Sequence, residues 1–257
     1  MWIRLRQIAV VAADLHHAGL EIGGVLGVEA CYVDPGVKLF GLKNMLWPIG
    51  TQMLEVVTPI VDGTAGGRYI ERRKGDGGYM VICEVDDVGH RRARAAELGV
   101  RVAFELDTPG EHEGIQLHPG DTGGSFFEMD QMLMAGGGDV GGPWHPAGNN
   151  WEPYVRTERV SGISAAELQS PEPDRLAQRW SEIAEIDLAP DDDGNPTLQF
   201  DNATVRFVED ADGRGEGLGG IDLITEDGDA VREAAEMFGC LTGDDELMVA
   251  GLRMYLR

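Results

Sequence analysis

Apolar residues in the first part of the chain fall into short runs with strand character, interrupted by a stretch with helical spacing. Residues 3–13 form an apolar run rich in β-formers, and residues 16–26 have helical character up to Gly27. Residues 61–69 are expected to form a glycine-containing loop that leads into residues 70–74. Between the helical stretch and this loop, three strands in a meander are expected at residues 36–42, 44–48 and 52–58.

The same order of elements returns after residue 78. Residues 79–85 have the pattern of a strand, and residues 88–98 that of a helix that Asp86 or Asp87 caps and Gly99 stops. Three more strands are expected at residues 100–106, 115–118 and 125–129. The pattern therefore predicts a β-α-β-β-β unit that occurs twice.

A constant shift of 73 residues relates the two units. The shift lays residues 8–15 over 81–88 and residues 54–56 over 127–129. The spacing from Gln7 to Glu55 equals that from Met80 to Glu128, at 48 residues. Equal spacing at four positions favours an internal repeat, in which Glu55 and Glu128 are equivalent.

The second half repeats this order in trimmed form. Ser170 is a candidate cap for a helix, with Pro171 at its first position. Strands are expected at residues 160–168, 197–200, 203–208, 220–225 and 246–257, and helices at residues 171–185 and 229–238. The chain is thus predicted to be an α+β protein with a domain at 1–135, a linker or strap at 136–154 and a second domain at 155–257.

The segment between the predicted domains is rich in glycine but holds two tryptophans, Trp144 and Trp151. Tryptophans in such a segment usually pack onto a surface. Two interpretations stay open, a strap across the surface of the domain or a lid near a pocket. His145, beside Trp144, could reach such a pocket.

The charge of the chain restricts its partners. A formal net charge of −24 argues against binding to nucleic acid or to an anionic membrane, since both need basic surfaces. The cysteines Cys31, Cys83 and Cys240 are isolated and odd in number, as is typical of reduced thiols in a cytoplasmic protein. No apolar run reaches the length of a membrane span. We therefore expect a cytoplasmic protein with a small-molecule ligand.

The hairpin around residues 114–130 holds the candidate chemistry. Gln116 and His118 are two residues apart and would share a strand face. Glu128 lies in an otherwise apolar strand, where an ionised carboxylate is costly unless it is paired or binds a metal ion. These residues indicate either a ligand or acid/base set, or a satisfied hairpin with Glu128 facing water. His112, in an acidic loop, is expected to be exposed.

Three stretches resemble the vicinal oxygen chelate superfamily, which includes glyoxalases, bleomycin-resistance proteins and extradiol dioxygenases. Residues 7–15 are similar to its opening strand, residues 78–88 to the strand of its second unit, and residues 117–128 to the closing hairpin of its methylmalonyl-CoA epimerase branch. The resemblance implies two tandem domains, each built from paired βαβββ units that form a cup-shaped mixed sheet. It covers residues 1–135 well, whereas residues 155–257 match in architecture but not in motifs.

The resemblance also implies one divalent metal ion, held by two side chains from each unit. By position the metal ligands are Gln7, Glu55 and Glu128, while Met80 stands where the family usually has a histidine. A thioether is a poor ligand for Mn, Mg, Fe, Ni or Zn, among which the sequence does not distinguish. His118 could supply the missing imidazole. The equivalent positions of the second half offer no carboxylate or imidazole and are Gly162, Phe207, Gly220 and Arg253.

Two functions of different classes follow. The first is a metal-assisted enzyme that moves a proton on a small oxygenated metabolite, of isomerase, epimerase, lyase or dioxygenase type, with His118 and Glu128 as catalytic residues. The second is a metal-free protein that sequesters a small molecule in the same cup, and a degenerate structural domain is a third interpretation. A monomer or a homodimer is expected. The predicted substrate contacts are Trp47, Tyr79, Met80 and Gln116.

Overall fold

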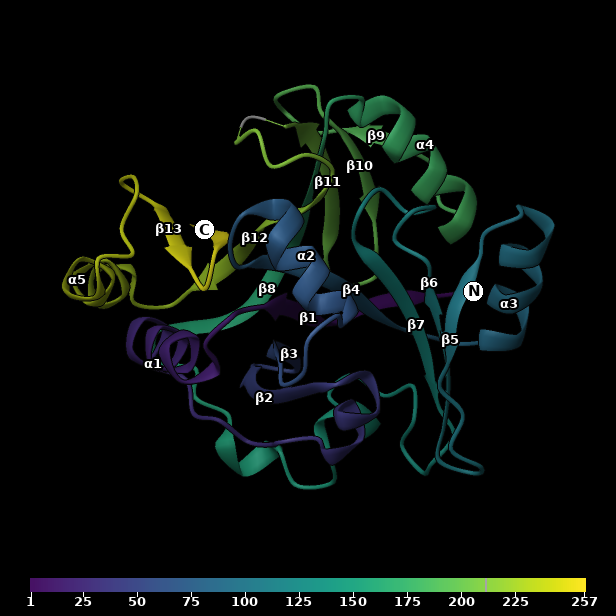
Figure 1. Cartoon of the computed structure of the whole chain (residues 1–257), viewed down its shortest axis with the longest axis horizontal. Coiled ribbons are helices and arrows are strands. Elements are labelled where there is room, and N and C mark those ends of the chain that lie inside the picture. Colours follow the sequence, from purple (N-terminus) through teal and green to yellow (C-terminus); the bar gives the residue numbers. More distant parts are fainter. Residues whose placement is uncertain (211) are drawn as a thin grey trace. The chain divides into compact units, whose positions relative to one another are not determined.

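Two β-sheets form the scaffold in the computed structural model, which describes residues 1–210 and 212–257 (Figure 1). The strands of the first sheet are β1 (Ile3–Val11), β2 (Leu42–Ile49), β3 (Gln52–Pro59), β4 (Gly77–Val85), β5 (Val102–Glu105), β6 (His112–Leu117) and β7 (Phe126–Met132). Those of the second are β8 (Val160–Ser170), β9 (Ala189–Pro190), β10 (Pro196–Gln199), β11 (Thr204–Glu209), β12 (Gly217–Thr225), β13 (Glu246–Val249) and β14 (Leu252–Leu256).

Both sheets are seven-stranded and mixed. The first has the strand order β2-β3-β1-β4-β7-β6-β5 and the second the order β13-β14-β12-β8-β11-β10-β9. Parallel pairs, such as β4 with β7 and β8 with β11, stand beside antiparallel hairpins such as β6–β7. The α+β class with two tandem sheets built from paired βαβββ units is therefore confirmed.

The helices begin and end where local capping chemistry sets them. Asp14, Asp87 and Asp227 each accept backbone hydrogen bonds at a helix start, and Gly27 and Gly239 end helices in the left-handed conformation. None of the described helices is long and apolar enough to cross a membrane. The α-helices are α1 (Leu15–Leu26), α2 (Ala65–Arg73), α3 (Val88–Glu97), α4 (Pro173–Ala184) and α5 (Gly228–Phe238).

By its contacts the chain forms two compact bodies. The first body comprises residues 1–7, 79–145 and 165–218, and the second comprises residues 8–78, 146–164 and 219–257. Each is described by itself below. The division into domains at 1–135 and 155–257 stays a prediction.

The core of the first body lies between helix α4 and the strands β7 and β11. Phe127 stacks on Trp180 with ring centroids 4.1 Å apart, and Phe207 meets the same indole edge-on at 6.1 Å. The indole N–H of Trp180 donates to the carbonyl of Thr122 at 3.0 Å, so the buried polar group of this large side chain is satisfied. This packing fixes helix α4 beside the turn between β6 and β7.

In the second body, helices α1 and α5 lie side by side (Figure 1). Gly24 of α1 faces the ring of Phe238, and any Cβ at position 24 would collide with that ring. The absence of a side chain therefore allows the two helices to approach closely.

The predicted start of a helix at Pro171 with Ser170 as its cap was wrong, because strand β8 runs to Ser170 and helix α4 begins at Pro173. Two predicted elements of the first half were also wrong. Residues 35–40 form a 3₁₀ helix instead of the start of a strand, because Asp34 caps it, Pro35 pre-forms its first turn and Gly41 ends it. Residues 65–73 form helix α2 instead of a loop, because the Thr64 hydroxyl accepts the backbone N–H of Gly67. The capping residues prevailed over the apolar content in the first case and over the glycines in the second.

Candidate functional site

One face of strands β4, β6 and β7 in the first body gathers acidic and amide side chains, and we call it the carboxyl face. Residues that pair directly across neighbouring strands share a face, and alternate residues of one strand do so as well. Ile82 pairs with Glu128 and Glu84 with Asp130, while Gln116 of β6 also pairs with Glu128. The carboxyl face therefore holds Met80, Ile82, Glu84, His112, Gly114, Gln116, Phe126, Glu128, Asp130 and Met132.

Glu128 and Asp130 form a buried pair of carboxyl groups at the centre of this face. Their exposed fractions are 4% and 0%. Among the described residues no hydrogen-bond donor reaches Oε2 of Glu128 or either oxygen of Asp130. Burial raises the pKa of Glu128 well above its ordinary value, and the charge of Asp130 adds to the effect. Burial also raises the pKa of Asp130 to about 8. The pair therefore retains at least one proton at neutral pH.

His112 lies next to this pair, and its predicted exposure was wrong. It begins strand β6, is 3% exposed, and its Nε2 lies 3.0 Å from Oδ1 of Asp130, at an angle that does not make a hydrogen bond. Its ring stacks on that of His145 at 4.8 Å between centroids. Burial lowers the pKa of His112, which favours the neutral imidazole.

Gly114 provides the space that Asp130 occupies. A Cβ at position 114 would lie closer than 3.0 Å to Oδ1 of Asp130, 3.2 Å from its Cγ and 3.1 Å from Nε2 of His112. The backbone of Gly114 does not adopt a positive φ, so its conformation is open to any residue. The glycine is therefore required by space and not by backbone conformation.

The first part of the strap, residues 138–145, is anchored at the Glu84 end of the carboxyl face. Glu84 is 1% exposed and accepts the backbone N–H of Gly138 at 3.0 Å. Arg4 and Arg6 lie 3.4 and 3.5 Å from Oε2 of Glu84. Both arginines also donate to strap carbonyls, Arg4 to Gly138 and Arg6 to Gly142. A buried ionic cluster thus holds the strap in place.

Trp144 is the buried anchor of the strap. It is fully buried, its Nε1 donates to Oε1 of Gln7 at 2.8 Å, and the guanidinium of Arg6 lies 5.0 Å from its ring centroid. The neighbouring His145 donates its backbone N–H to the sulfur of Met132 at 3.3 Å. The strap therefore packs on the first body through residues 138–145.

The accessible end of the carboxyl face lies away from the strap. Gln116 and Phe126 are half-buried, whereas Glu84, Asp130 and His112 are buried. Tyr79, which precedes Met80, meets Phe126 edge-on with ring centroids 5.1 Å apart. Of the predicted substrate contacts, Met80 and Gln116 share the carboxyl face with Glu128, and Tyr79 packs at its edge.

Glu55 and Trp47 lie in the second body, on opposite faces of the β2–β3 hairpin. Glu55 pairs with Leu46, while Trp47 pairs with Leu54. The Glu55 carboxylate is 6% exposed and accepts a hydrogen bond from Nδ2 of Asn44 at 2.6 Å. The Trp47 ring packs against Gly19 of helix α1, since a Cβ at position 19 would lie 3.2 Å from the ring. Trp47 thus packs under a helix, on the side of the hairpin away from Glu55.

His118 lies outside the strand that was expected to carry it. Strand β6 ends at Leu117, and Nδ1 of His118 accepts the backbone N–H of Gly120 within the turn. The side chain is partly exposed and stabilises the turn. The imidazole beside the carboxyl pair is that of His112, so the catalytic assignment of His118 stays a prediction.

The side chains at the predicted metal positions do not fit a divalent ion. The Gln7 amide oxygen already accepts the Trp144 indole N–H, and Met80 offers only a thioether. Among the described residues no group of three or more His, Cys, Asp or Glu side chains is arranged to hold a metal. In the first body the carboxylate of Glu128 alone makes a weak donor set for such an ion.

The chain was compared with known protein families, sequences and structures. No protein-family model matches the chain. The chain is 26% identical over 134 residues to the ethylmalonyl-CoA/methylmalonyl-CoA epimerase of Cereibacter sphaeroides, a match that covers 50% of this chain and 98% of the epimerase.

Two solved structures share the fold over most of the chain. A mutant of 4-hydroxymandelate synthase from Streptomyces coelicolor aligns with a TM-score of 0.65 at 13% identity, covering 91% of this chain and 74% of the synthase. A hypothetical protein from Staphylococcus aureus aligns with a TM-score of 0.64 at 13% identity, covering 100% of this chain and 99% of its own. The fold is that of tandem glyoxalase-like domains. Over half of its length the chain is also similar in sequence to the epimerase, which agrees with the resemblance to the vicinal oxygen chelate superfamily.

Proposed function

We propose that this chain catalyses proton transfer at a carbon atom next to a carbonyl group of a small oxygenated metabolite, with Glu128 as the residue that carries the proton. The observation on which the proposal rests is the Glu128 carboxyl, which is 4% exposed and whose Oε2 has no donor among the described residues. Such an oxygen retains its basicity for a substrate, because no protein hydrogen bond competes for it.

The surroundings of Glu128 suit an uncharged acyl group. Met80 and Phe126 flank it on the carboxyl face, and the Gln116 amide hydrogen-bonds to it and lowers its pKa slightly against the effect of burial. In the proposed step the ionised form of the Glu128 carboxyl takes the proton from the α-carbon, and the electrons of the C–H bond move into the carbonyl as an enolate. Water then returns a proton to the opposite face of that carbon, which gives the epimer, and Glu128 releases its proton to water, which restores the carboxylate. The name of the C. sphaeroides relative supports this reaction class.

The test follows exchange of the α-proton by NMR in heavy water. Ethylmalonyl-CoA and methylmalonyl-CoA are the first probes, since the relative acts on these thioesters. We expect exchange with wild type and a loss of about 100-fold or more in Glu128→Gln, the usual size of a general acid/base contribution. Glu111→Gln, an exposed acid on the same chain, is the matched control and should exchange at the wild-type rate. Equal rates in wild type and Glu128→Gln would refute the role of Glu128.

A metal-free binding protein is the second candidate. It is favoured by the poor donor set at positions 7, 55, 80 and 128 and by the apolar character of Met80, Tyr79 and Phe126. Calorimetry distinguishes the two: a thioester or other carbonyl compound that binds without any α-proton exchange supports the binding protein.

A further inference from the structure

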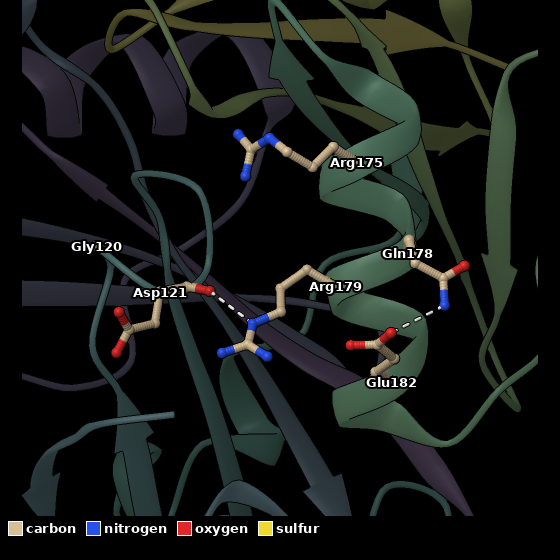
Figure 2. Close-up of a pocket in the computed structure, with 6 residues that line it drawn as sticks. All are labelled: Gly120, Asp121, Arg175, Gln178, Arg179 and Glu182. Atoms are coloured by element: carbon tan, nitrogen blue, oxygen red, sulfur yellow. Dashed lines mark hydrogen bonds between the residues drawn. The ribbon is translucent and has the colours of Figure 1, made fainter. Parts of the chain in front are cut away.

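A groove separate from the carboxyl face lies between helix α4 and the turn that joins β6 to β7. It has a volume of about 460 Å³ and is lined by Gly120, Asp121, Arg175, Gln178, Arg179 and Glu182. This volume falls in the range of small-molecule sites. Figure 2 shows that Arg175 and Arg179 extend from the helix toward the turn that carries Gly120 and Asp121.

The helix presents these side chains because of its amphipathic sequence. Its buried stripe comprises Leu176, Ala177, Trp180, Ile183 and Ala184. Positions 175, 178, 179 and 182 lie outside this buried stripe, are spaced at intervals of three and four, and form a stripe that is exposed at 175 and 178 and half-buried at 179 and 182. Two guanidinium groups therefore stand one helical turn apart over the groove.

The charges of the groove are unevenly matched. Arg101 donates two hydrogen bonds to the Asp121 carboxylate, with Nε–Oδ2 and Nη2–Oδ1 distances of 2.8 Å each. Glu182 accepts the amide of Gln178 at 3.1 Å, and Arg175 is bonded to Glu172 and Glu216.

Arg179 differs from its neighbours. Its described hydrogen bonds go only to backbone carbonyls, at 3.3 Å to Asp121 and 3.5 Å to Leu98, and no carboxylate among the described residues lies within ion-pair distance of it. Both contacts are long. Arg179 therefore has no carboxylate partner among the described residues, although the chain has 45 acidic and 21 basic residues.

We propose that this groove binds an oxyanion of a small metabolite, a phosphate or a carboxylate, on the Arg179 guanidinium with support from Arg175. A planar guanidinium matches two oxygens of such a group and forms the stronger, charge-assisted kind of hydrogen bond. The cavity is larger than the anion alone, so the rest of the metabolite lies along the stripe toward Gln178. Glu182, at the far end of the stripe, weakens binding by its charge.

Titration calorimetry of the full chain at constant ionic strength tests the proposal, with inorganic phosphate and malonate as separate probes. We expect saturable binding of at least one probe and a weakening of about tenfold or more in Arg179→Gln. Arg179→Lys, which keeps the charge but loses the two-point geometry, should bind with intermediate affinity, and Glu182→Gln should bind more tightly than wild type.

Arg156→Gln is the matched control, because Arg156 is an exposed arginine paired with Glu29 in the second body. It should bind as wild type does. Glu128→Gln should also bind normally, which separates this site from the proposed proton transfer. Saturation by phosphate but not malonate assigns a phosphate-bearing ligand, and the reverse assigns a carboxylate. Absence of saturation up to about 50 mM of both probes, or equal affinity in Arg179→Gln, would overturn the proposal.

Discussion

Gly114→Ala is the sharpest test of the geometry around the buried carboxyl pair. The added methyl would fall closer than 3.0 Å to Oδ1 of Asp130 and 3.2 Å from its Cγ, whereas ordinary contact begins at 3.4 Å. The carboxyl oxygen must move by roughly 1 Å or more, as expected of an overpacked core. Asp130 is fully buried and His112 lies 3.0 Å from the same oxygen, so little room exists for this shift.

We expect Gly114→Ala to lower the free energy of unfolding by about 1–3 kcal/mol, the usual cost of forcing a methyl group into a packed interior. Urea unfolding followed by circular dichroism measures it. Asp130→Ala removes the atoms that collide, so the double variant should lose less than the sum of the two single variants, with a coupling of about 1 kcal/mol.

The control is Gly23→Ala in helix α1, where the nearest atom to an added Cβ is an oxygen at 3.5 Å, an ordinary contact. There alanine should be neutral or stabilise the protein by about 0.5–1 kcal/mol, because it favours the helix. If Gly114→Ala unfolds within about 0.5 kcal/mol of wild type, or if Asp130→Ala leaves its cost unchanged, the placement of Asp130 beside Gly114 is wrong.

Three further predictions concern titration, thiols and metal. Because Arg101 lowers the pKa of Asp121 to about 2, the stabilisation from this ion pair is present above the ordinary aspartate pKa and is lost as the pH falls through about 2. Carbon NMR should show the Asp121 pKa rising to its ordinary value in Arg101→Ala, and an unchanged titration would contradict the pairing. Burial raises the pKa of Cys83 well above its ordinary value, so iodoacetamide should label it only in denaturant, while rapid labelling of the native protein would disprove its burial. Protein purified without chelators should carry less than about 0.1 equivalent of divalent metal, whereas a stoichiometric ion that is lost in Glu128→Ala would support the predicted ligands instead.

The order of elements was predictable because its signals are local. Strand β4 and helix α3 follow from an apolar run, the capping Asp87 and the stop at Gly99. The two wrong elements were decided by signals that are local as well, such as Thr64 and the Asp34-Pro35 pair. In both segments the capping residues decide the structure, although the apolar or glycine content of the segment favours a different element.

The candidate site was predictable only in part. The burial of Glu128 follows from its apolar strand. Alternate residues of a strand share a face, so Glu84 could have been predicted on the face of Met80, and Asp130 on the face of Glu128. His112 could not have been found in this way. Its burial depends on where strand β6 begins, which is set by its pairing with Met132 across the hairpin.

The strap shows why packing between residues that are far apart in the chain cannot be predicted from local sequence patterns. Trp144 was expected to pack onto a surface, but the surface it meets is made by Gln7 and Arg6, more than 130 residues away in the chain. The ionic cluster under it joins strand β1, strand β4 and the glycines of the strap, and a buried cluster of this kind is tolerated only where each charge has its partners. Gly138 has a positive φ, and a Cβ at position 142 would collide with the carbonyl oxygen of Gly136, so the glycines that indicated a linker are also what allows the strap to fold as it does. Because the strap is bound at the Glu84 end, the half-buried Gln116 and Phe126 mark the end of the carboxyl face from which the ligand that we propose for Glu128 would approach.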